Sequence, residues 1–228
     1  MKTLYISDLD GTLLRSDART SEYTIQTINA LVDRGMLFSY ATARSYLTAS
    51  KVTAGLRTDL PLVVYNGAAL VDGRDGSPML KNFFGGEVRE VLADLSAKGV
   101  YPLVYAFVDG KEKFSYIPAR CTPGMTNFLD SRKGDIRTRP VADEEGLRQG
   151  EIFYLTCIDE KARLEPLYEK YREKYHCVFQ REIYTKEQWK SCPWRLPSPG
   201  LFCSCKGCWA VTGWWCSGTV PMMPTCLL

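Results

Sequence analysis

Residues 2–13 read KTLYISDLDGTL, and this stretch decides the fold class of the chain. Its first half, residues 2–7, is a short apolar run that stops at the carboxylates of Asp8 and Asp10. A short apolar run that ends at a polar turn is typical of a buried β-strand, because a helix would show a longer periodic pattern. Gly11 then lets the backbone turn sharply. The sequence therefore predicts a buried strand followed at once by acidic side chains.

Two more strands follow the same pattern in the next sixty residues. Residues 36–41 (MLFSYA) and 61–65 (PLVVY) are nearly continuous apolar runs. Between the strands, apolar side chains recur at helical spacing over 25–32, Gly35 ends that helix, and a shorter helix is expected over 46–56. Apolar strands that alternate with helices predict an α/β fold with a doubly wound parallel sheet.

The pattern changes after about residue 80, where hairpins mix with helices. Residues 101–107 and 112–117 flank Asp109-Gly110, which is a strong hairpin turn signal. We expect an inserted α+β domain here. Its further elements are a helix near 88–95, a strand over 151–158, a helix over 160–175 and two short strands within 177–189.

Composition excludes several classes of protein. The 228 residues carry 29 basic and 26 acidic side chains, a net charge of +3, which is too small to indicate a nucleic-acid or membrane partner. Acidic residues interrupt the N-terminal apolar run, so it does not resemble a signal peptide. Residues 1–190 hold only three of the nine cysteines, which is typical of a reduced, cytoplasmic protein. Nothing in the sequence indicates the oligomeric state.

Polar motifs follow each of the three predicted strands. They are DLDGT at 8–12, TARS at 42–45 and NGA at 66–68. In open parallel sheets, ligands bind outside the carboxyl ends of the strands. We therefore expect these three motifs to converge on one crevice.

The residue types in these motifs favour phosphoryl transfer. Asp8 and Asp10 repel each other unless a cation lies with them, and oxygen ligands without His or Cys suit Mg²⁺. The Thr42 hydroxyl, the Arg44 charge and backbone N–H groups after Asn66 suit an anion. Together they indicate a reaction through an aspartyl phosphate. Two plainer alternatives stay open, since Thr42 is also a plausible helix cap and Asn66 a plausible simple turn residue.

These motifs resemble a known family. ISDLDGTLL and ATARS are similar to the first two motifs of the haloacid dehalogenase (HAD) superfamily of phosphatases, and VVYNGA is similar to the third-strand signature of its Cof-type subgroup with a class IIB cap. The resemblance covers roughly residues 1–189. It implies a Rossmann-like catalytic core over 1–80, an α+β cap over 81–187 that closes over the crevice and selects the substrate, and a remainder over 188–228.

The resemblance also implies residue roles. Asp8 is implied to attack phosphorus, and Asp10 to protonate the leaving oxygen and then activate water. The Asp8 carboxylate and the Asp10 carbonyl are implied to hold Mg²⁺. The substrate is implied to be a small phosphate monoester such as a sugar phosphate. The residues implied to bind it are Thr42, Arg44, Asn66 and Gly67.

The last 38 residues do not continue this resemblance. Residues 191–228 hold six of the nine cysteines, four of the five tryptophans and no acid. The family continues with a motif-three Lys and then an apolar strand ending in GDxxND, and neither is present. A zinc site at Cys203, Cys205 and Cys208 is a weak alternative, because the spacing CxCxxC lacks a second pair. A membrane span is disfavoured by the polar residues and prolines after 207.

A shifted reading frame explains this tail. Read one base earlier, the codons of Trp214-Trp215-Cys216 force Val-Val, and those of Met222-Met223-Pro224 force Asp-Ala. Their neighbours permit VVFGDGANDADML, and the codons of 190–198 permit EIMPLEATK. We therefore infer a one-base deletion, or a sequencing error, near Trp189–Lys190. The chain as written is then expected to be impaired and poorly soluble, with the first strand left at an unpaired edge.

Two alternatives to an impaired phosphatase stay open. One is a catalytically inactive remnant that still binds a phosphorylated ligand. The other is a phosphosugar mutase, which shares the aspartyl-phosphate step but returns the phosphoryl group to its product.

Overall fold

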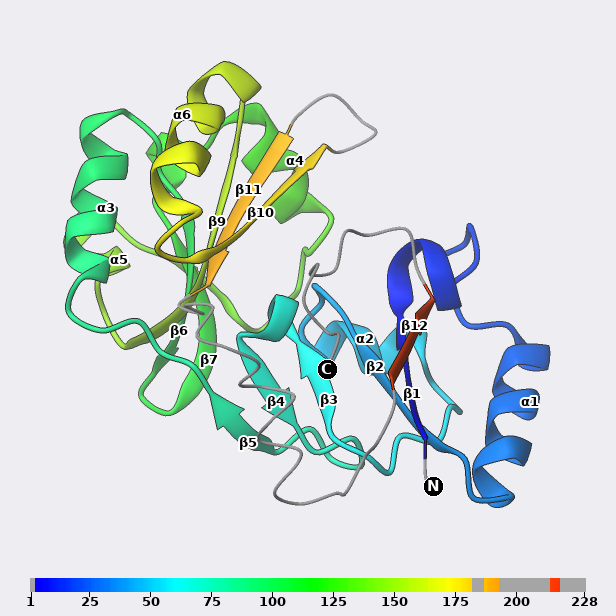
Figure 1. Cartoon of the computed structure of the whole chain (residues 1–228). Helices are drawn as coiled ribbons and strands as arrows, with labels where there is room; N and C mark the ends of the chain where they lie inside the picture. The colour runs from blue at the N-terminus through cyan, green and yellow to red at the C-terminus, as the bar shows by residue number, and fades with distance from the viewer. Residues whose placement is uncertain (1–2, 182–186, 193–213, 218–228) are drawn as a thin grey trace. The chain divides into compact units, whose positions relative to one another are not determined.

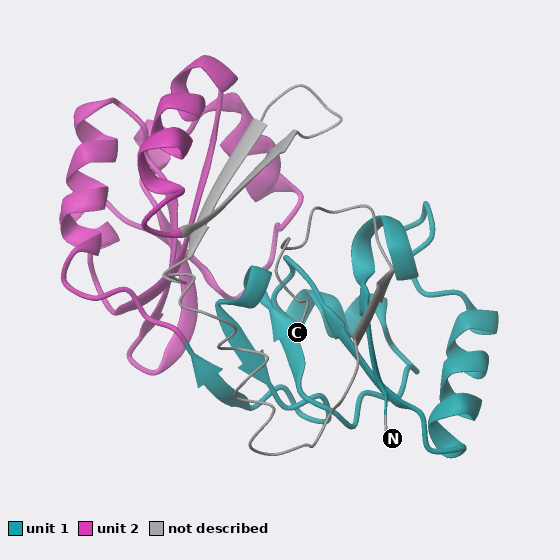
Figure 2. Cartoon of the chain, viewed as in Figure 1, with its two compact units in different colours: residues 1–81, 196–228 teal, residues 82–195 magenta. Residues whose placement is uncertain are grey.

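The structure is a computed structural model. It describes the backbone of residues 3–181, 187–192 and 214–217 and the side chains of residues 3–175. The chain divides into two compact units, residues 1–81 with 196–228, and residues 82–195 (Figures 1 and 2). No helix in the described ranges is long and apolar enough to cross a membrane.

The first unit is built on a mixed, mostly parallel sheet. Its strand order is β12-β1-β2-β3-β4-β5 (Figure 1). The four strands from β12 to β3 run parallel, and β4 and β5 are antiparallel. The α/β fold and the three predicted strands are confirmed, but the prediction that the first strand is buried is wrong, because no residue of β1 is buried. The strands are β1 (Leu4–Asp8), β2 (Leu37–Ala41), β3 (Leu62–Val64), β4 (Ala69–Val71), β5 (Pro78–Lys81) and β12 (Trp214–Ser217).

The antiparallel strands β4 and β5 were not anticipated. They are three and four residues long, too short for a period-two pattern to be recognised. The turn between them closes through two backbone hydrogen bonds: the Asp72 N–H donates to the Ser77 carbonyl at 2.8 Å, and the Gly76 N–H donates to the Asp72 carbonyl at 2.9 Å. The sheet is therefore parallel only as far as β3.

Two capped helices connect the parallel strands. Helix α1 (Glu22–Asp33) begins at Ser21, whose hydroxyl accepts from the N–H three residues on. Helix α2 (Tyr46–Val52) begins in the same way at Ser45, so Ser45 and not Thr42 is its cap. Helix α2 is four residues shorter at its end than predicted. The short irregular segments η1 (Leu9–Leu13) and η2 (Tyr65–Gly67) follow β1 and β3.

The expectation that β1 lies at an unpaired edge is wrong. The backbone of β12 pairs with β1 in parallel, with Leu4 opposite Trp214 and Ser7 opposite Ser217. Backbone hydrogen bonds do not depend on side-chain identity, and aromatic residues favour strands, so the segment forms a strand without the expected sequence. The poor solubility expected for this chain therefore cannot be attributed to an unpaired edge at β1.

The second unit is an α+β body. Its sheet has the order β10-β11-β9-β6-β7-β8, and α3 and α6 contribute to one buried apolar cluster with the sheet residues Val104, Ala106 and Leu155. Asp109 and Gly110 turn the β6–β7 hairpin with φ of 50° and 71°, as the turn signal predicted. The strands are β6 (Leu103–Val108), β7 (Lys111–Tyr116), β8 (Thr138–Pro140), β9 (Glu151–Asp159), β10 (His176–Arg181) and β11 (Glu187–Cys192). The helices are α3 (Val88–Ala97), η3 (Pro118–Arg120), α4 (Pro123–Asp130), α5 (Glu144–Leu147) and α6 (Lys161–Tyr171).

A buried arginine stabilises this second unit. The Arg137 side chain is only 7% exposed, and its guanidinium lies 2.6 Å from Asp135 and 2.7 Å from Glu112. These hydrogen bonds hold the pKa of Asp135 below its usual value. We expect Arg137→Ala to lower the free energy of unfolding by about 3 kcal/mol, since two acids would lose their counter-charge in a buried setting. Chemical denaturation of the full chain measures this.

The matched control is an exposed arginine pair in the same unit. Arg172 is 49% exposed and lies 3.0 Å from Glu169. Arg172→Ala is expected to change the free energy of unfolding by less than about 0.5 kcal/mol, the range of an exposed ion pair. Equal losses in the two variants would show that the burial of Arg137 does not matter.

Candidate active site

The register of the sheet brings the ends of three strands into line. Asp8 at the end of β1 lies opposite Ala41 at the end of β2, and Ala41 lies opposite Val63 in β3. The strand order also reverses at β1, since β2 lies on one side of it and β12 on the other. Such a switch point is where open α/β sheets bind ligands, outside the carboxyl ends of the strands. The expected crevice therefore begins at Asp8.

The segment after β1 is held in an irregular turn. Leu9 is fully buried, and its carbonyl accepts from the Leu14 N–H at 2.9 Å. Asp10 has extended backbone angles inside this turn, and Gly11 follows with φ of 76°, where a side chain would be strained. The half-buried Asp8 carboxylate accepts from the Leu9 N–H at 2.7 Å. Both acids are thus held at the end of the strand, where the sequence predicted them.

The environment of Asp8 disfavours its charged form. Burial raises the pKa of Asp8, the hydrogen bond from Leu9 lowers it, and the Asp10 charge raises it further, with a net rise. No cation of the described residues pairs with the Asp8 carboxylate. A half-buried carboxylate beside a second acid is a setting that a bound cation would stabilise.

The raised pKa leads to a prediction about stability. A carboxyl group whose folded-state pKa is raised stabilises the fold below its unfolded pKa, and that stability is lost as the pH rises through the folded pKa. Asp8→Asn is therefore expected to raise the melting temperature at pH 7 without Mg²⁺, and the difference should disappear below about pH 3.8, the ordinary value for Asp. Thermal unfolding at the two pH values checks this. A lower melting temperature for the variant at pH 7 would contradict it.

Arg44 grips Asp10. The Arg44 Nε donates to one Asp10 carboxylate oxygen at 2.8 Å and Nη2 donates to the other at 2.7 Å. The pair is partly open to solvent, with the Arg44 side chain 26% and the Asp10 side chain 54% exposed. The hydrogen bonds to Asp10 also raise the pKa of Arg44. The sequence placed both residues in the crevice but did not predict that they bind each other.

Backbone hydrogen bonds join the loops after β2 and β3. The Thr42 carbonyl accepts from the Asn66 N–H and the Arg44 carbonyl from the Tyr65 N–H, both at 3.0 Å. The Thr42 hydroxyl, in a side chain that is nearly fully buried, accepts from the Arg44 N–H at 3.1 Å. Its own O–H remains a donor. The two loops therefore form one connected wall.

This wall narrows the set of anion donors expected after Asn66. The Ala68 N–H already donates to the Tyr65 carbonyl, so it is not available to a ligand, and the N–H groups of Tyr65 and Asn66 themselves also donate to backbone carbonyls. Tyr65, Asn66 and Gly67 also share positive φ angles of 54°, 53° and 93°. Three successive left-handed residues are strained for Tyr and tolerated by Asn and Gly. Asn-Gly at this position thus permits the turn that joins the two loops.

The donor set at the strand ends fits a hard divalent cation. Asp8 offers a carboxylate without a counter-charge and Asp10 a backbone carbonyl, which are oxygen ligands that Mg²⁺ accepts. The described residues contain no group of three or more His, Cys, Asp or Glu side chains that could hold a metal. Within that part of the chain, a cation at Asp8 would therefore depend on few protein ligands.

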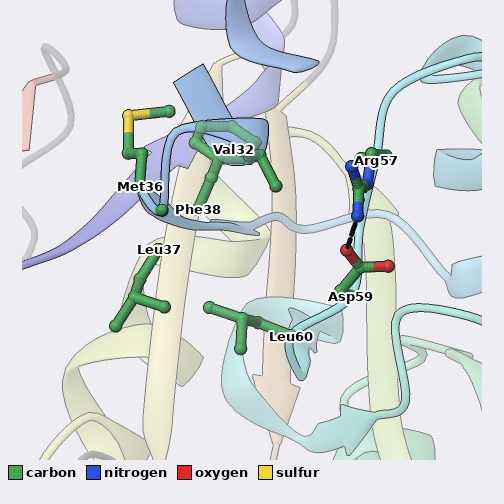
Figure 3. Close-up of a pocket in the computed structure, with 8 residues that line it drawn as sticks. Val32, Met36, Leu37, Phe38, Arg57, Asp59 and Leu60 are labelled. Carbon is green, nitrogen blue, oxygen red and sulfur yellow. Dashed lines mark hydrogen bonds and ion pairs between the residues drawn. The ribbon is translucent and has the colours of Figure 1, made fainter. Parts of the chain in front are cut away.

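A pocket in this unit lies away from the predicted site. It measures about 180 Å³ and lies where α1 ends and β2 begins (Figure 3). Its wall is mainly apolar, and the paired side chains of Arg57 and Asp59 lie at one side of it in Figure 3. None of the predicted site residues lines it. The lining residues are Val32, Gly35, Met36, Leu37, Phe38, Arg57, Asp59 and Leu60.

The amino-acid sequence matches a known family over most of its length. Residues 5–192 match the family of haloacid dehalogenase-like hydrolases. The chain belongs to this family. Two curated relatives are the HMP-PP phosphatase of Serratia proteamaculans, 38% identical over 32% of this chain, and the 5-amino-6-(5-phospho-D-ribitylamino)uracil phosphatase of Bacillus subtilis, 39% identical over 31%. The matched stretch spans only 27% and 26% of those two proteins.

Solved structures share the fold of the HAD-like chain. A haloacid dehalogenase-like hydrolase from Bacteroides thetaiotaomicron aligns with a TM-score of 0.70 over 93% of this chain and 79% of its own, at 17% identity. The HAD subclass IIB sugar phosphatase BT4131 aligns with a TM-score of 0.58 over 84% and 70%, at 20% identity. At such identities the likeness concerns the fold alone. This shared fold agrees with the Rossmann-like and class IIB architecture that the family resemblance implies.

Proposed function

We propose that this HAD-family chain is built as a Mg²⁺-dependent phosphatase that hydrolyses small phosphate monoesters through an aspartyl phosphate on Asp8. The observation that carries this proposal is the placement of Asp8, Asp10, Thr42 and Arg44 at the aligned ends of β1 and β2. A sugar phosphate is the first substrate class to test, because phosphatases of small phosphorylated metabolites occur among the relatives.

Asp8 supplies the nucleophile. One of its carboxylate oxygens accepts from the Leu9 N–H, which fixes the orientation of the group. The attacking oxygen forms a bond to phosphorus while the ester P–O bond breaks, and Asp10 gives a proton to the departing oxygen. Asp10 then takes a proton from a water molecule as that water attacks the aspartyl phosphate. Asp8 leaves as a carboxylate, and inorganic phosphate is released.

The remaining residues bind and orient the phosphoryl group. The Thr42 O–H is a donor for one phosphoryl oxygen, and Arg44 supplies positive charge beside it. Asn66 and Gly67 complete the wall through the turn they permit. Bound at the Asp8 carboxylate and the Asp10 carbonyl, Mg²⁺ would supply charge neutralisation for the dianionic substrate.

We also propose a separate role for each of three segments of the chain. Residues 1–80 supply the chemistry, residues 81–187 act as the cap that selects the substrate, and residues 188–228 are a remnant altered by a frame change that impairs catalysis. Cys121 is a free thiol in the described part, which suits a reducing, cytoplasmic compartment. The zinc alternative at Cys203, Cys205 and Cys208 lies outside the described residues.

The test is hydrolysis of a generic phosphate ester by the full chain with and without Mg²⁺. Release of inorganic phosphate that requires Mg²⁺ and Asp8 supports the proposal. Return of the phosphoryl group to a sugar product would identify a mutase. Phosphate binding without turnover would indicate an inactive ligand-binding protein.

A further inference from the structure

We propose that Arg44 and Asp10 form a latch, in which Asp10 occupies the anion-binding edge of Arg44 until a phosphate group displaces it. The Arg44–Asp10 latch rests on the proposed function, since it concerns the same anion site. Its distinct content is that Arg44 has two partners in turn. In the free chain the guanidinium binds Asp10, and in the liganded chain it binds phosphate.

The geometry of the pair supports this exchange. Nε and Nη2 of Arg44 donate to both oxygens of Asp10, at 2.8 and 2.7 Å. This parallel two-bond arrangement is also how arginine binds phosphate. The carboxylate therefore occupies the edge of the guanidinium that a phosphate would use, so the two ligands exclude each other there.

The exposure of the pair makes it easy to open. The Asp10 side chain is 54% exposed and the Arg44 side chain 26%. Ion pairs this open to water contribute little to stability, because solvent already screens both charges. A phosphate dianion carries twice the charge of the carboxylate and competes well for the same donors. The ion pair therefore forms in the free chain, and a phosphate dianion can displace Asp10 from Arg44.

The backbone allows the side chains to part without unfolding the site. The Arg44 N–H donates to the Thr42 hydroxyl and the Arg44 carbonyl accepts from Tyr65, so the base of the side chain stays fixed. Asp10 lies in the irregular turn before Gly11, and its carboxylate has open solvent to enter. Release would also free the Asp10 carboxyl for the proton transfers assigned to it.

The experiment is a double-substitution cycle read by phosphate binding. Inorganic phosphate is titrated calorimetrically, in buffer with Mg²⁺, into the full chain as wild type, Asp10→Asn, Arg44→Gln and the double variant. Asp10→Asn removes the competing carboxylate and keeps its shape. The gain in phosphate affinity from Asp10→Asn is expected to be about fivefold larger when Arg44 is present, which corresponds to an exposed ion pair of about 1 kcal/mol.

A matched pair controls for the loss of charge. Arg74 binds Asp72 through the same two-bond geometry, with Nε at 3.0 Å and Nη2 at 2.6 Å. The corresponding cycle with Asp72→Asn and Arg74→Gln is expected to leave phosphate affinity unchanged within about twofold. A coupling as large in this control pair would show that the effect is long-range charge, and the latch would be wrong.

Other outcomes also decide the matter. Equal gains from Asp10→Asn with and without Arg44 would overturn the latch, and so would wild-type affinity in Arg44→Gln or absence of phosphate binding in all four chains. Hydrolysis that depends on Asp8 is measured separately. If Asp8-dependent hydrolysis is present while the cycle shows no coupling, the proposed phosphatase activity is supported and the latch is wrong. If it is absent while the coupling is found, the anion site stands without the proposed reaction.

Discussion

Hydrolysis of a phosphate ester by this chain is expected to fall by about 10⁴-fold or more when Asp8 is replaced by Asn, the order of loss seen when an enzyme loses its nucleophile. The amide keeps the shape of the carboxylate, and its oxygen can still accept from the Leu9 N–H at the end of β1. What it lacks is a negatively charged oxygen that can form an acyl phosphate. The loss therefore reports chemistry and not misfolding.

Asp17 provides the matched control for this substitution. Its carboxylate also accepts a hydrogen bond from a nearby backbone N–H, that of Arg19 at 3.1 Å, and it is exposed. Asp17→Asn is expected to keep activity within about twofold of wild type, as substitutions away from a site usually do. Initial rates of phosphate release, with Mg²⁺ present, measure both variants. Activity retained by Asp8→Asn would assign the nucleophile to another group.

Much of the first unit could be predicted because its strands are apolar runs with polar ends. The apolar runs predicted β1, β2 and β3 to within one or two residues, since side-chain burial on both faces removes polar residues from such strands. The ends of the runs also led to the prediction that Asp8, Thr42 and Asn66 line one crevice. The three-residue strand β4 carries no period, so its antiparallel pairing with β3 was not predictable.

The contacts inside the crevice could not be predicted in the same way. Whether Arg44 faces a ligand or another side chain depends on the turn after β1, in which Gly11 has a positive φ. Likewise, the N–H of Asn66 is consumed by the Thr42 carbonyl, a pairing between two loops that are distant in sequence. Residue types and strand ends predict which groups gather, and the backbone path decides which of them bind each other.

The burial of the first unit supports the shifted-frame hypothesis. No residue of β1 is buried, and Tyr5 is 44% exposed, although β1 is flanked by strands on both sides. Helix α1 also has no buried residue. By contrast, four of the five residues in β2 are buried. A central parallel strand is normally covered on both faces, so the described part of this unit lacks some of its expected cover.

The sequence comparisons agree with the same position for the change. The family match ends at residue 192, close to the inferred deletion near Trp189–Lys190. From residue 191 onward the chain contains no acid that could join Asp8 at a Mg²⁺ site. The backbone of β12 still occupies the place beside β1 where the family strand is expected, but Trp214–Ser217 ends without a carboxylate. We therefore propose that catalysis and stability are lost together at this strand.

Restoring the frame by one base near codon 189 is expected to raise Mg²⁺-dependent hydrolysis by about 100-fold or more, because a carboxylate and a lysine would complete the metal and phosphate sites. The melting temperature should rise by about 10 °C, since covering the partly exposed side chains of Leu4, Tyr5 and Ile6 in β1 would contribute about 3 kcal/mol to a chain of this size. Phosphate release and thermal unfolding of both chains measure the two effects.

A chain that stops after Cys192 distinguishes two interpretations of residues 193–228, a frame-shifted remnant and a segment that takes part in catalysis. If residues 193–228 are a frame-shifted remnant, this shortened chain and the full chain should have equally low activity, and resequencing the coding DNA should show GDxxND in the shifted frame. If the full chain instead matches the restored chain in Asp8-dependent activity and the shortened chain is inactive, the tail as written takes part in catalysis. A metal ligand of a different kind would then have to come from residues after β11, where cysteines and not acids are available.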